Sequence, residues 1–416
     1  MYEKTTLPNG VRILTEAIPG VRTAALGIFV GTGSRHERAA ENGAAHFIEH
    51  MTFKGTARRT AAQLAQEMDA IGGQVNAYTT KESTCFYARC LDCHLDRAAD
   101  ILCDMFFESR FAREDVTTER GVILEEIDMY EDTPEDLCAE RLATAVYRGS
   151  SLARPILGKT STLEKMDGDW LRAYRDSHYA PGVIVVALAG SFSPDTVERL
   201  KDRFGAMETR PAVGCRPARY TPSWTVKRKA IEQNHLTLAF PALNWGDRRR
   251  YQLQLLVNIL GGGMSSRLFQ EVREKRGLCY TTYAYNADHA DIGVLGIYTA
   301  LGKETEEQAL DTIRAVAEEL ADRGPEEEEL SRTREQCKAN VLMGLESVQA
   351  RMSQLGRSEL LLGEIQSPDE IIAGYDAVTR EEVHNLAREL MDFGRVSLSA
   401  VGRVSGVEDY QHWLKL

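Results

Sequence analysis

The order of apolar and polar residues predicts short strands in some stretches and amphipathic helices in others. The stretch TAALGIFVGTGSRHERAAENGAAHFIEHM opens with an alternating apolar segment that predicts a strand, and residues 74–91 alternate between apolar and polar side chains as a pair of strands does. Apolar residues recur with helical spacing in residues 94–111 and 114–132. The same spacing continues in the C-terminal part, near residues 303–323, 325–363 and 379–392. Strands mixed with long helices in this way predict an α+β fold.

The sequence divides near its midpoint into two halves with a similar order of elements. Residues 209–224 contain three of only 12 prolines, and proline clusters without periodicity are typical of linkers. Each half opens with an apolar strand, a charged loop and a helix, which indicates an internal repeat. We therefore predict an N-terminal domain over residues 1–208, a linker over 209–224 and a C-terminal domain over 225–416. Both domains should have a similar fold, with a mixed or antiparallel sheet packed by helices.

The overall composition limits the classes of function. The chain has 416 residues, of which 43% are hydrophobic and 27% charged, which is ordinary for a folded protein with large cores. Its formal net charge of −12 argues against a nucleic-acid-binding protein, because such proteins need a basic surface. No apolar run reaches the roughly 18–20 residues needed to cross a membrane, and the N-terminus does not resemble a secretory signal. We expect a cytoplasmic protein that binds neither nucleic acids nor membranes.

One short stretch, ENGAAHFIEHMTFKGT at residues 41–56, carries a possible metal site. On a helix, residues i, i+3 and i+4 share one face, so His46, Glu49 and His50 point the same way. Two imidazoles one turn apart can bind one zinc ion, and the glutamate between them is placed to take a proton from water. This is the H-x-x-E-H motif of inverted zinc peptidases. Histidine pairs with helical spacing also occur on solvated helix faces, so the pentapeptide alone leaves both interpretations open.

A second acidic stretch, TTERGVILEEIDMYEDTPEDL at residues 117–137, offers the third protein ligand that a catalytic zinc needs. Glu119 and Glu126 are seven residues apart and share a helix face with Val122 and Ile123. A carboxylate on a partly apolar face is costly to bury unless it is paired or binds a metal. The alternative is an acidic helix with a solvated face.

These blocks together resemble the pitrilysin/insulinase family of inverted zincins, most closely its bacterial and mitochondrial processing-peptidase branch. The resemblance rests on H-x-x-E-H, on Glu126 at 76 residues beyond that motif, and on the blocks GTGSRHE, GGQVNAYT, PILG and MSSRLFQEVREKRGLCY, all in the family's order. It implies two similar α+β domains in a half-clamshell and one zinc ion per chain. His46, His50 and Glu126 would bind the zinc, Glu49 would be the general base, and Glu119 would orient a ligating histidine.

The resemblance also covers residues outside the metal motif. Arg273 and Tyr280 match the family's Arg-x6-Tyr pair, which suits the polarisation of a peptide carbonyl. Without the family, Tyr280 would be interpreted as an ordinary strand residue. Asn76, Ala77 and Tyr78 match the family's edge strand, which pairs with the substrate backbone. These three residues alone fit an ordinary sheet strand equally well.

The function that the resemblance implies is that of a zinc-dependent metalloendopeptidase. Its substrates would be short or unfolded peptides, including leader or presequence peptides. In two-chain members of the family, the Arg/Tyr pair comes from the partner subunit, so we expect a homodimer whose active site is completed by the partner's C-terminal domain. The alternative is a non-catalytic structural or partner subunit of a processing-peptidase-like complex. The presence of both the zinc motif and the Arg/Tyr pair on one chain favours the enzyme.

Overall fold

The computed structural model describes residues 2–416, which form two compact units. The first unit holds the chain up to Asp128, together with Arg154–Arg216 and Met343–Ile365. The second holds Met129–Ala153, Pro217–Leu342 and Gln366–Leu416. Each unit is therefore built from segments of both halves of the sequence.

The first unit contains a six-stranded sheet with the strand order β1-β2-β6-β3-β5-β4. All neighbouring strands are antiparallel except β2 and β6, which are parallel. Strand β4 lies at one edge of this sheet. The strands are β1 (Glu3–Thr6), β2 (Arg12–Ala17), β3 (Thr23–Val30), β4 (Gln74–Thr79), β5 (Thr84–Leu91) and β6 (Ile184–Gly190).

Both faces of this sheet are covered, which explains why its central strands are apolar throughout. Successive side chains of a strand point to opposite faces. Leu26 and Ile28 of β3 belong to a core on one face, whereas Ala25 and Phe29 belong to a core on the other face together with Met352. The helices of the first unit are α1 (Ala44–Thr52), α2 (Ala61–Ala70), α3 (Leu95–Glu108), α4 (Arg113–Asp132, of which the residues up to Asp128 belong to this unit), α6 (Thr160–Leu163), α7 (Gly168–His178), α8 (Pro194–Gly205) and α12 (Val348–Leu362).

The second unit contains a five-stranded sheet with the order β7-β11-β8-β10-β9. Strands β7 and β11 are parallel and the other neighbours are antiparallel. The strands are β7 (Trp224–Arg228), β8 (Asn234–Ala242), β9 (Cys279–Asp288), β10 (Gly293–Leu301) and β11 (Ser397–Gly402). The helices are α5 (Pro134–Val146), α9 (Arg250–Gly261), the π-helix η6 (Phe269–Glu274), α10 (Glu306–Arg323), α11 (Glu327–Gly344), α13 (Pro368–Ala377), α14 (Arg380–Leu390) and α15 (Val407–Trp413).

The two sheets have the same topology, which shows that the two halves of the chain are structural repeats. The order β2-β6-β3-β5-β4 of the first unit corresponds strand by strand to β7-β11-β8-β10-β9 of the second. Helix α1 packs against the edge strand β4, and helix α9 packs against the edge strand β9. The helix that carries the polar triplet therefore corresponds to an apolar helix in the second unit.

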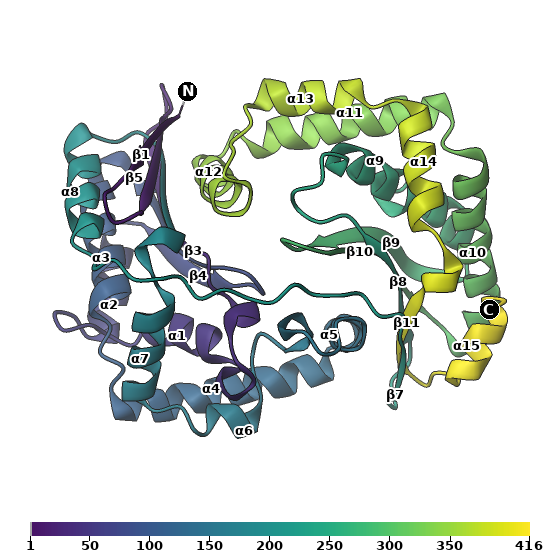
Figure 1. The fold of residues 1–416 in the computed structure, drawn as a ribbon, viewed down its shortest axis with the longest axis horizontal. Helices are drawn as coiled ribbons and strands as arrows, with labels where there is room; N and C mark the ends of the chain where they lie inside the picture. Colours follow the sequence, from purple (N-terminus) through teal and green to yellow (C-terminus); the bar gives the residue numbers. More distant parts are fainter. Residues whose placement is uncertain (1) are drawn as a thin grey trace. The chain divides into compact units, whose positions relative to one another are not determined.

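The repeats exchange one helix. Helix α12, drawn in yellow-green in Figure 1, belongs to the C-terminal half of the sequence but packs on β3 and β6 of the first unit. Helix α5, drawn in blue, belongs to the N-terminal half but packs on β8 and β11 of the second unit. The compact units therefore differ from the predicted domains 1–208 and 225–416 by these two exchanged segments.

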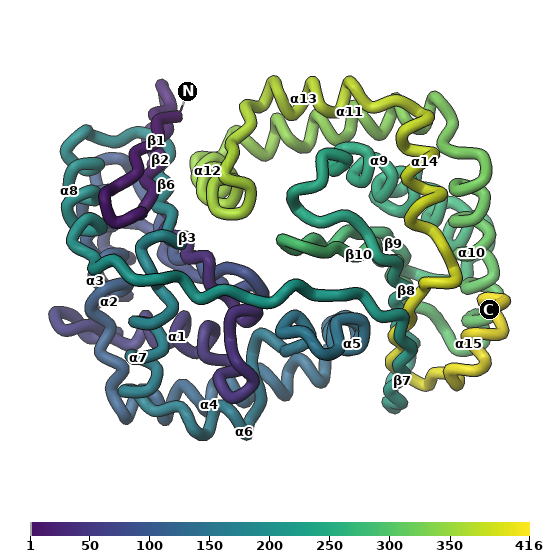
Figure 2. The backbone as a smooth tube through the Cα atoms, in the orientation of Figure 1, coloured from purple at the N-terminus to yellow at the C-terminus, as the bar shows by residue number. Residues whose placement is uncertain are grey.

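The segment from Glu208 to Ser223 forms neither helix nor strand, and Figure 2 shows it as an extended part of the tube. The division between the two units, at Arg216 and Pro217, falls inside it. Within residues 2–416, no helix combines the length and the apolar character that crossing a membrane requires.

Candidate active site

The site is built on helix α1, whose first turn is fixed by close packing and by a buried carboxylate. Gly43 precedes the helix with φ +98°, and a Cβ atom there would lie 2.9 Å from both the Gly158 Cα atom and the Leu157 oxygen. The Glu37 carboxylate accepts hydrogen bonds of 2.9 Å from the backbone N–H groups of Gly43 and Ala45. Because the first N–H groups of a helix lack partners within the helix, Glu37 acts as its N-terminal cap. These contacts set the direction in which the α1 side chains point.

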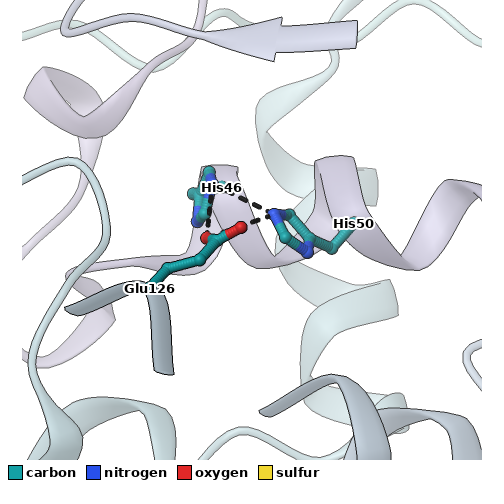
Figure 3. A group of neighbouring side chains, drawn as sticks. All are labelled: His46, His50 and Glu126. Atoms are coloured by element: carbon teal, nitrogen blue, oxygen red, sulfur yellow. Dashed lines mark hydrogen bonds and ion pairs between the residues drawn. The ribbon is translucent and has the colours of Figure 1, made fainter. Parts of the chain in front are cut away.

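His46 and His50 of α1 converge with Glu126 of α4, as Figure 3 shows. The two Nε2 atoms are 3.2 Å apart. The Glu126 Oε2 atom is 3.6 Å from each of them. The structure thus brings together the three residues that the sequence analysis predicts as metal ligands.

The spacing of these three atoms fits a zinc ion. Tetrahedral zinc with bonds of about 2.0–2.1 Å keeps its ligand atoms about 3.3–3.4 Å apart, close to the observed separations. The buried Glu126 Oε2 atom has no hydrogen-bond partner among residues 2–416, and binding a cation would give it one. Burial, and to a lesser extent the neighbouring His50, lowers the pKa of His46 to about 3, so its imidazole is neutral and free to bind a metal at pH 7. Two nitrogens and one carboxylate oxygen are also a common set of zinc ligands.

Glu119 fixes the orientation of His50. Its side chain is only 5% exposed, and its carboxylate accepts a hydrogen bond of 2.8 Å from His50 Nδ1. With Nδ1 protonated, the lone pair on Nε2 of His50 points toward Glu126. The Lys54 Nζ atom lies 2.5 Å from the other oxygen of Glu119 and compensates its buried charge. Glu119 thus lies beside a predicted metal ligand, in the position that the family resemblance implies.

Glu49 lies one turn along the same face of α1 and is the candidate base. Burial raises the pKa of its carboxyl group, and the nearby negative charge of Glu126 raises it further. A hydrogen bond from Thr79 and the nearby His50 partly offset this increase. The Thr79 hydroxyl donates to Glu49 Oε2 over 2.6 Å. Glu49 is therefore held beside the ligand cluster by the last residue of β4.

The residues predicted to bind substrate lie on this same strand. Asn76 is exposed, Ala77 is buried in the core that contains α1, and Tyr78 packs on the opposite face of the sheet beside Cys85. Among residues 2–416, β4 pairs with β5 on one side and with no strand of the sheet on the other. Strand β4 is therefore an edge strand of the described sheet.

Arg273 and Tyr280 lie together in the second unit. The Arg273 guanidinium, from η6, lies 5.0 Å from the centre of the Tyr280 ring and 4.7 Å from that of Phe269. Tyr280, at the start of β9, is 72% exposed. A π-helix is rare and frequently occurs at functional sites. The two predicted residues form a cation–π pair in which Tyr280 is exposed and Arg273 is half-buried.

Sequence reasoning missed two residues of the site, Lys54 and Thr79. Both follow the predicted motifs by only a few positions, Lys54 after His50 and Thr79 directly after Tyr78. A lysine after a helix and a threonine in a strand are both commonplace, so nothing in the local pattern distinguishes them. Only the fold shows that Lys54 reaches Glu119 and that Thr79 reaches Glu49.

Comparison with solved structures supports the fold. The chain matches a peptidase M16 inactive domain from Pseudomonas fluorescens and a protease from Helicobacter pylori, each with a TM-score of 0.90 over 97% of this chain and 99% of the other. The sequence identities are 21% and 19%. The two-unit α+β architecture with mixed sheets packed by helices is therefore shared with these proteins.

Sequence comparison gives the family. Residues 12–160 match the model described as insulinase (peptidase family M16), and residues 165–337 match the one described as peptidase M16 inactive domain. A protein of Bacillus subtilis named "uncharacterized zinc protease YmxG" is 42% identical over 97% of this chain and 100% of its own length. A protein of Streptomyces coelicolor, also named an uncharacterized zinc protease, is 40% identical over 96% of this chain and 89% of its own. Together with the cluster of two histidines and a glutamate, these matches show that the chain belongs to the insulinase family of zinc peptidases, peptidase family M16.

Proposed function

We propose that this zinc peptidase cleaves peptide bonds inside short or unfolded peptides, with His46, His50 and Glu126 as the protein ligands of the metal. The observation that carries the proposal is the convergence of three ligand atoms at separations of 3.2–3.6 Å, beside the half-buried Glu49 on the helix that carries the two histidines. A zinc ion bound there would polarise the peptide carbonyl and make water acidic enough to lose a proton near neutral pH.

Glu49 is the residue that moves the proton. Its carboxylate takes a proton from the attacking water and passes it to the nitrogen of the leaving amine. Burial supports this role, because the raised pKa makes Glu49 a stronger base than an exposed glutamate. The Thr79 hydroxyl keeps the carboxylate in place during both steps.

Strand β4 is the proposed binding site for the substrate backbone. A peptide that adds a strand to its free edge, along Asn76, Ala77 and Tyr78, gains main-chain hydrogen bonds with little demand on its sequence. An extended conformation is available to short or unfolded peptides and not to folded domains. Leader or presequence peptides, which the resemblance to the processing-peptidase branch implies, belong to this class. We place this activity in the cytoplasm, which fractionation of cells that express the chain would test.

Arg273 and Tyr280 are proposed to bind the substrate carbonyl in a homodimer, where they come from the second copy of the chain. A guanidinium and a phenol O–H are the donors that a developing negative charge on the carbonyl oxygen needs. The exposure of Tyr280 and its contact with the Arg273 guanidinium support this role. A mixture of inactive His46→Ala and Arg273→Ala variants should regain activity when subunits exchange. Exchanged dimers without any recovered activity would contradict sharing between subunits.

The principal test compares Glu49→Gln with Glu125→Gln, a substitution of an exposed glutamate on α4. We expect E49Q to bind zinc normally and to hydrolyse peptides about 10²–10⁴-fold more slowly, because the general base is lost. E125Q should remain active, and in the wild type a chelator should abolish hydrolysis that added zinc restores. Wild-type rates in zinc-loaded E49Q would refute the role of Glu49. Mass analysis of the products from a random peptide mixture would then give the length and sequence preference.

A further inference from the structure

Thr79, the last residue of the block GGQVNAYT, makes the hydrogen bond that holds the Glu49 carboxylate. We propose that Thr79 is a positioning residue that determines which oxygen of Glu49 acts as the base. The inference rests on the proposed role of Glu49 as the general base. It concerns the hydroxyl group of Thr79 and not the metal ligands.

The geometry leaves one oxygen of Glu49 for the reaction. Thr79 Oγ1 lies 2.6 Å from Glu49 Oε2, and this is the one side-chain hydrogen bond to the Glu49 carboxylate described within residues 2–416. A short hydrogen bond to an ionised carboxylate is among the stronger kinds in proteins. Because Oε2 accepts from Thr79, the other oxygen, Oε1, stays available to take a proton from water. Free rotation of the carboxylate would instead present either oxygen.

A second threonine, Thr84, lies near Thr79 but is a weaker acceptor for its hydroxyl hydrogen than Glu49. Thr84, which faces Thr79 across the β4–β5 pair, is fully buried and donates its hydroxyl hydrogen to the Thr32 carbonyl over 2.9 Å. Each hydroxyl carries a single hydrogen. Thr84 therefore offers Thr79 Oγ1 only lone pairs, at a distance of 3.5 Å, whereas the Glu49 Oε2 atom lies 2.6 Å away and is the closer and stronger acceptor. The single hydrogen of Thr79 is therefore donated to Glu49.

The position of Thr79 at the end of β4 gives this contact its significance. The same strand is the proposed binding edge for the substrate backbone, so one rigid element sets both the register of the peptide and the orientation of the base. Misplacement of a reacting group by about 1 Å can cost roughly 100-fold in rate. We therefore expect loss of the hydroxyl to slow the chemical step without weakening substrate binding.

Two matched pairs of variants test the hydroxyl. Thr79→Val replaces the hydroxyl by a methyl group of similar size, and Thr79→Ser differs from Thr79→Ala only by one hydroxyl. We expect kcat to fall by about 10- to 100-fold in T79V relative to wild type and in T79A relative to T79S, since each loses one hydrogen bond to a charged group. KM should change less than about twofold, because β4 keeps its backbone. T79S should stay within about threefold of the wild type.

The zinc content and the unfolding temperature of every variant are measured on the same samples to show that each variant is folded and binds metal. If T79V does not fold, the comparison of T79A with T79S alone tests the role of the hydroxyl. A kcat that stays within twofold in both pairs would overturn the positioning role. A loss of kcat that is as large in T79S as in T79A, or an effect on KM in place of kcat, would also overturn it. E49Q is assayed alongside. Full activity of E49Q would show that the proposed function of Glu49 is wrong, whereas inactive E49Q with unchanged Thr79 variants would refute the role of Thr79 alone.

Discussion

Glu119→Gln removes the charge beside His50 while it keeps the shape of the side chain. In the wild type, the Glu119 carboxylate accepts a 2.8 Å hydrogen bond from His50 Nδ1 and lies 2.5 Å from Lys54 Nζ. Glutamine offers His50 a weaker, neutral acceptor, and it leaves the Lys54 charge less well compensated. Loss of such a partner behind a metal-bound histidine typically lowers metal affinity 10- to 100-fold, or about 1.4–2.7 kcal/mol. We expect this loss for E119Q.

The assay is competition for zinc between the metal-free protein and a chromophoric chelator at fixed pH. Glu125→Gln is the matched control, because it removes one negative charge from an exposed position of the same helix. Unfolding temperatures of both metal-free variants show whether the fold is intact. Zinc affinities that stay at the wild-type value in both E119Q and E125Q would refute the idea that Glu119 acts through His50. The same loss of affinity in both variants would also refute it and would indicate a general effect of charge.

Two further predictions concern the start of helix α1. Burial raises the pKa of Glu37 to about 7 from an ordinary value near 4.5, so between these pH values the folded protein holds a proton that the unfolded chain releases. The contribution of Glu37 to stability should therefore fall as pH rises from 4.5 to 7. In Glu37→Gln, the unfolding temperature should lose this part of its decrease between pH 5 and pH 7.5. An unchanged decrease in the variant would contradict the raised pKa of Glu37. Gly43→Ala should destabilise by about 1–3 kcal/mol in urea unfolding, because φ +98° and the 2.9 Å approach to Gly158 disfavour any side chain. The control is Gly121→Ala in the middle of α4, where an added Cβ atom has no neighbour within 4 Å and should stabilise the protein by about 0.4–1 kcal/mol. Equal effects of the two substitutions would contradict the proposed strain at Gly43.

The local pattern of the sequence predicted most elements of the fold. The strand pair in residues 74–91 is β4 and β5, and the helices predicted at 94–111 and 114–132 are α3 and α4. The comparisons confirm the predicted two-domain α+β fold and the assignment of the chain to a family of zinc peptidases. The long helix predicted at 325–363 is two helices, α11 and α12, with a break at residues 345–347. Helical spacing alone does not show this break, because apolar residues recur on both sides of it.

What the sequence did not show is which surface each element covers. The apolar face of α12 indicates that the helix is buried, but not that it packs on a sheet from the other half of the chain. The same limit applies to single polar side chains. His46, His50 and Glu126 share recognisable spacings, whereas the contacts of Thr79 and Lys54 depend on how strand β4 and helix α4 meet α1. Such contacts follow from tertiary packing and leave no periodic signal.

The exchange of α12 also bears on the order of events during synthesis of the chain. Without α12, one face of the first sheet, with Phe29 and Val185, has no helix to cover it. The ribosome must add roughly 150 residues beyond Arg216 before Ile365 completes that unit, which takes about 8–30 s at 5–20 residues per second. The unit that contains the cluster of two histidines and a glutamate is thus finished only when most of the polypeptide has been synthesised. A peptidase built in this way does not complete its first unit until residue 365 has been synthesised and has left the ribosome.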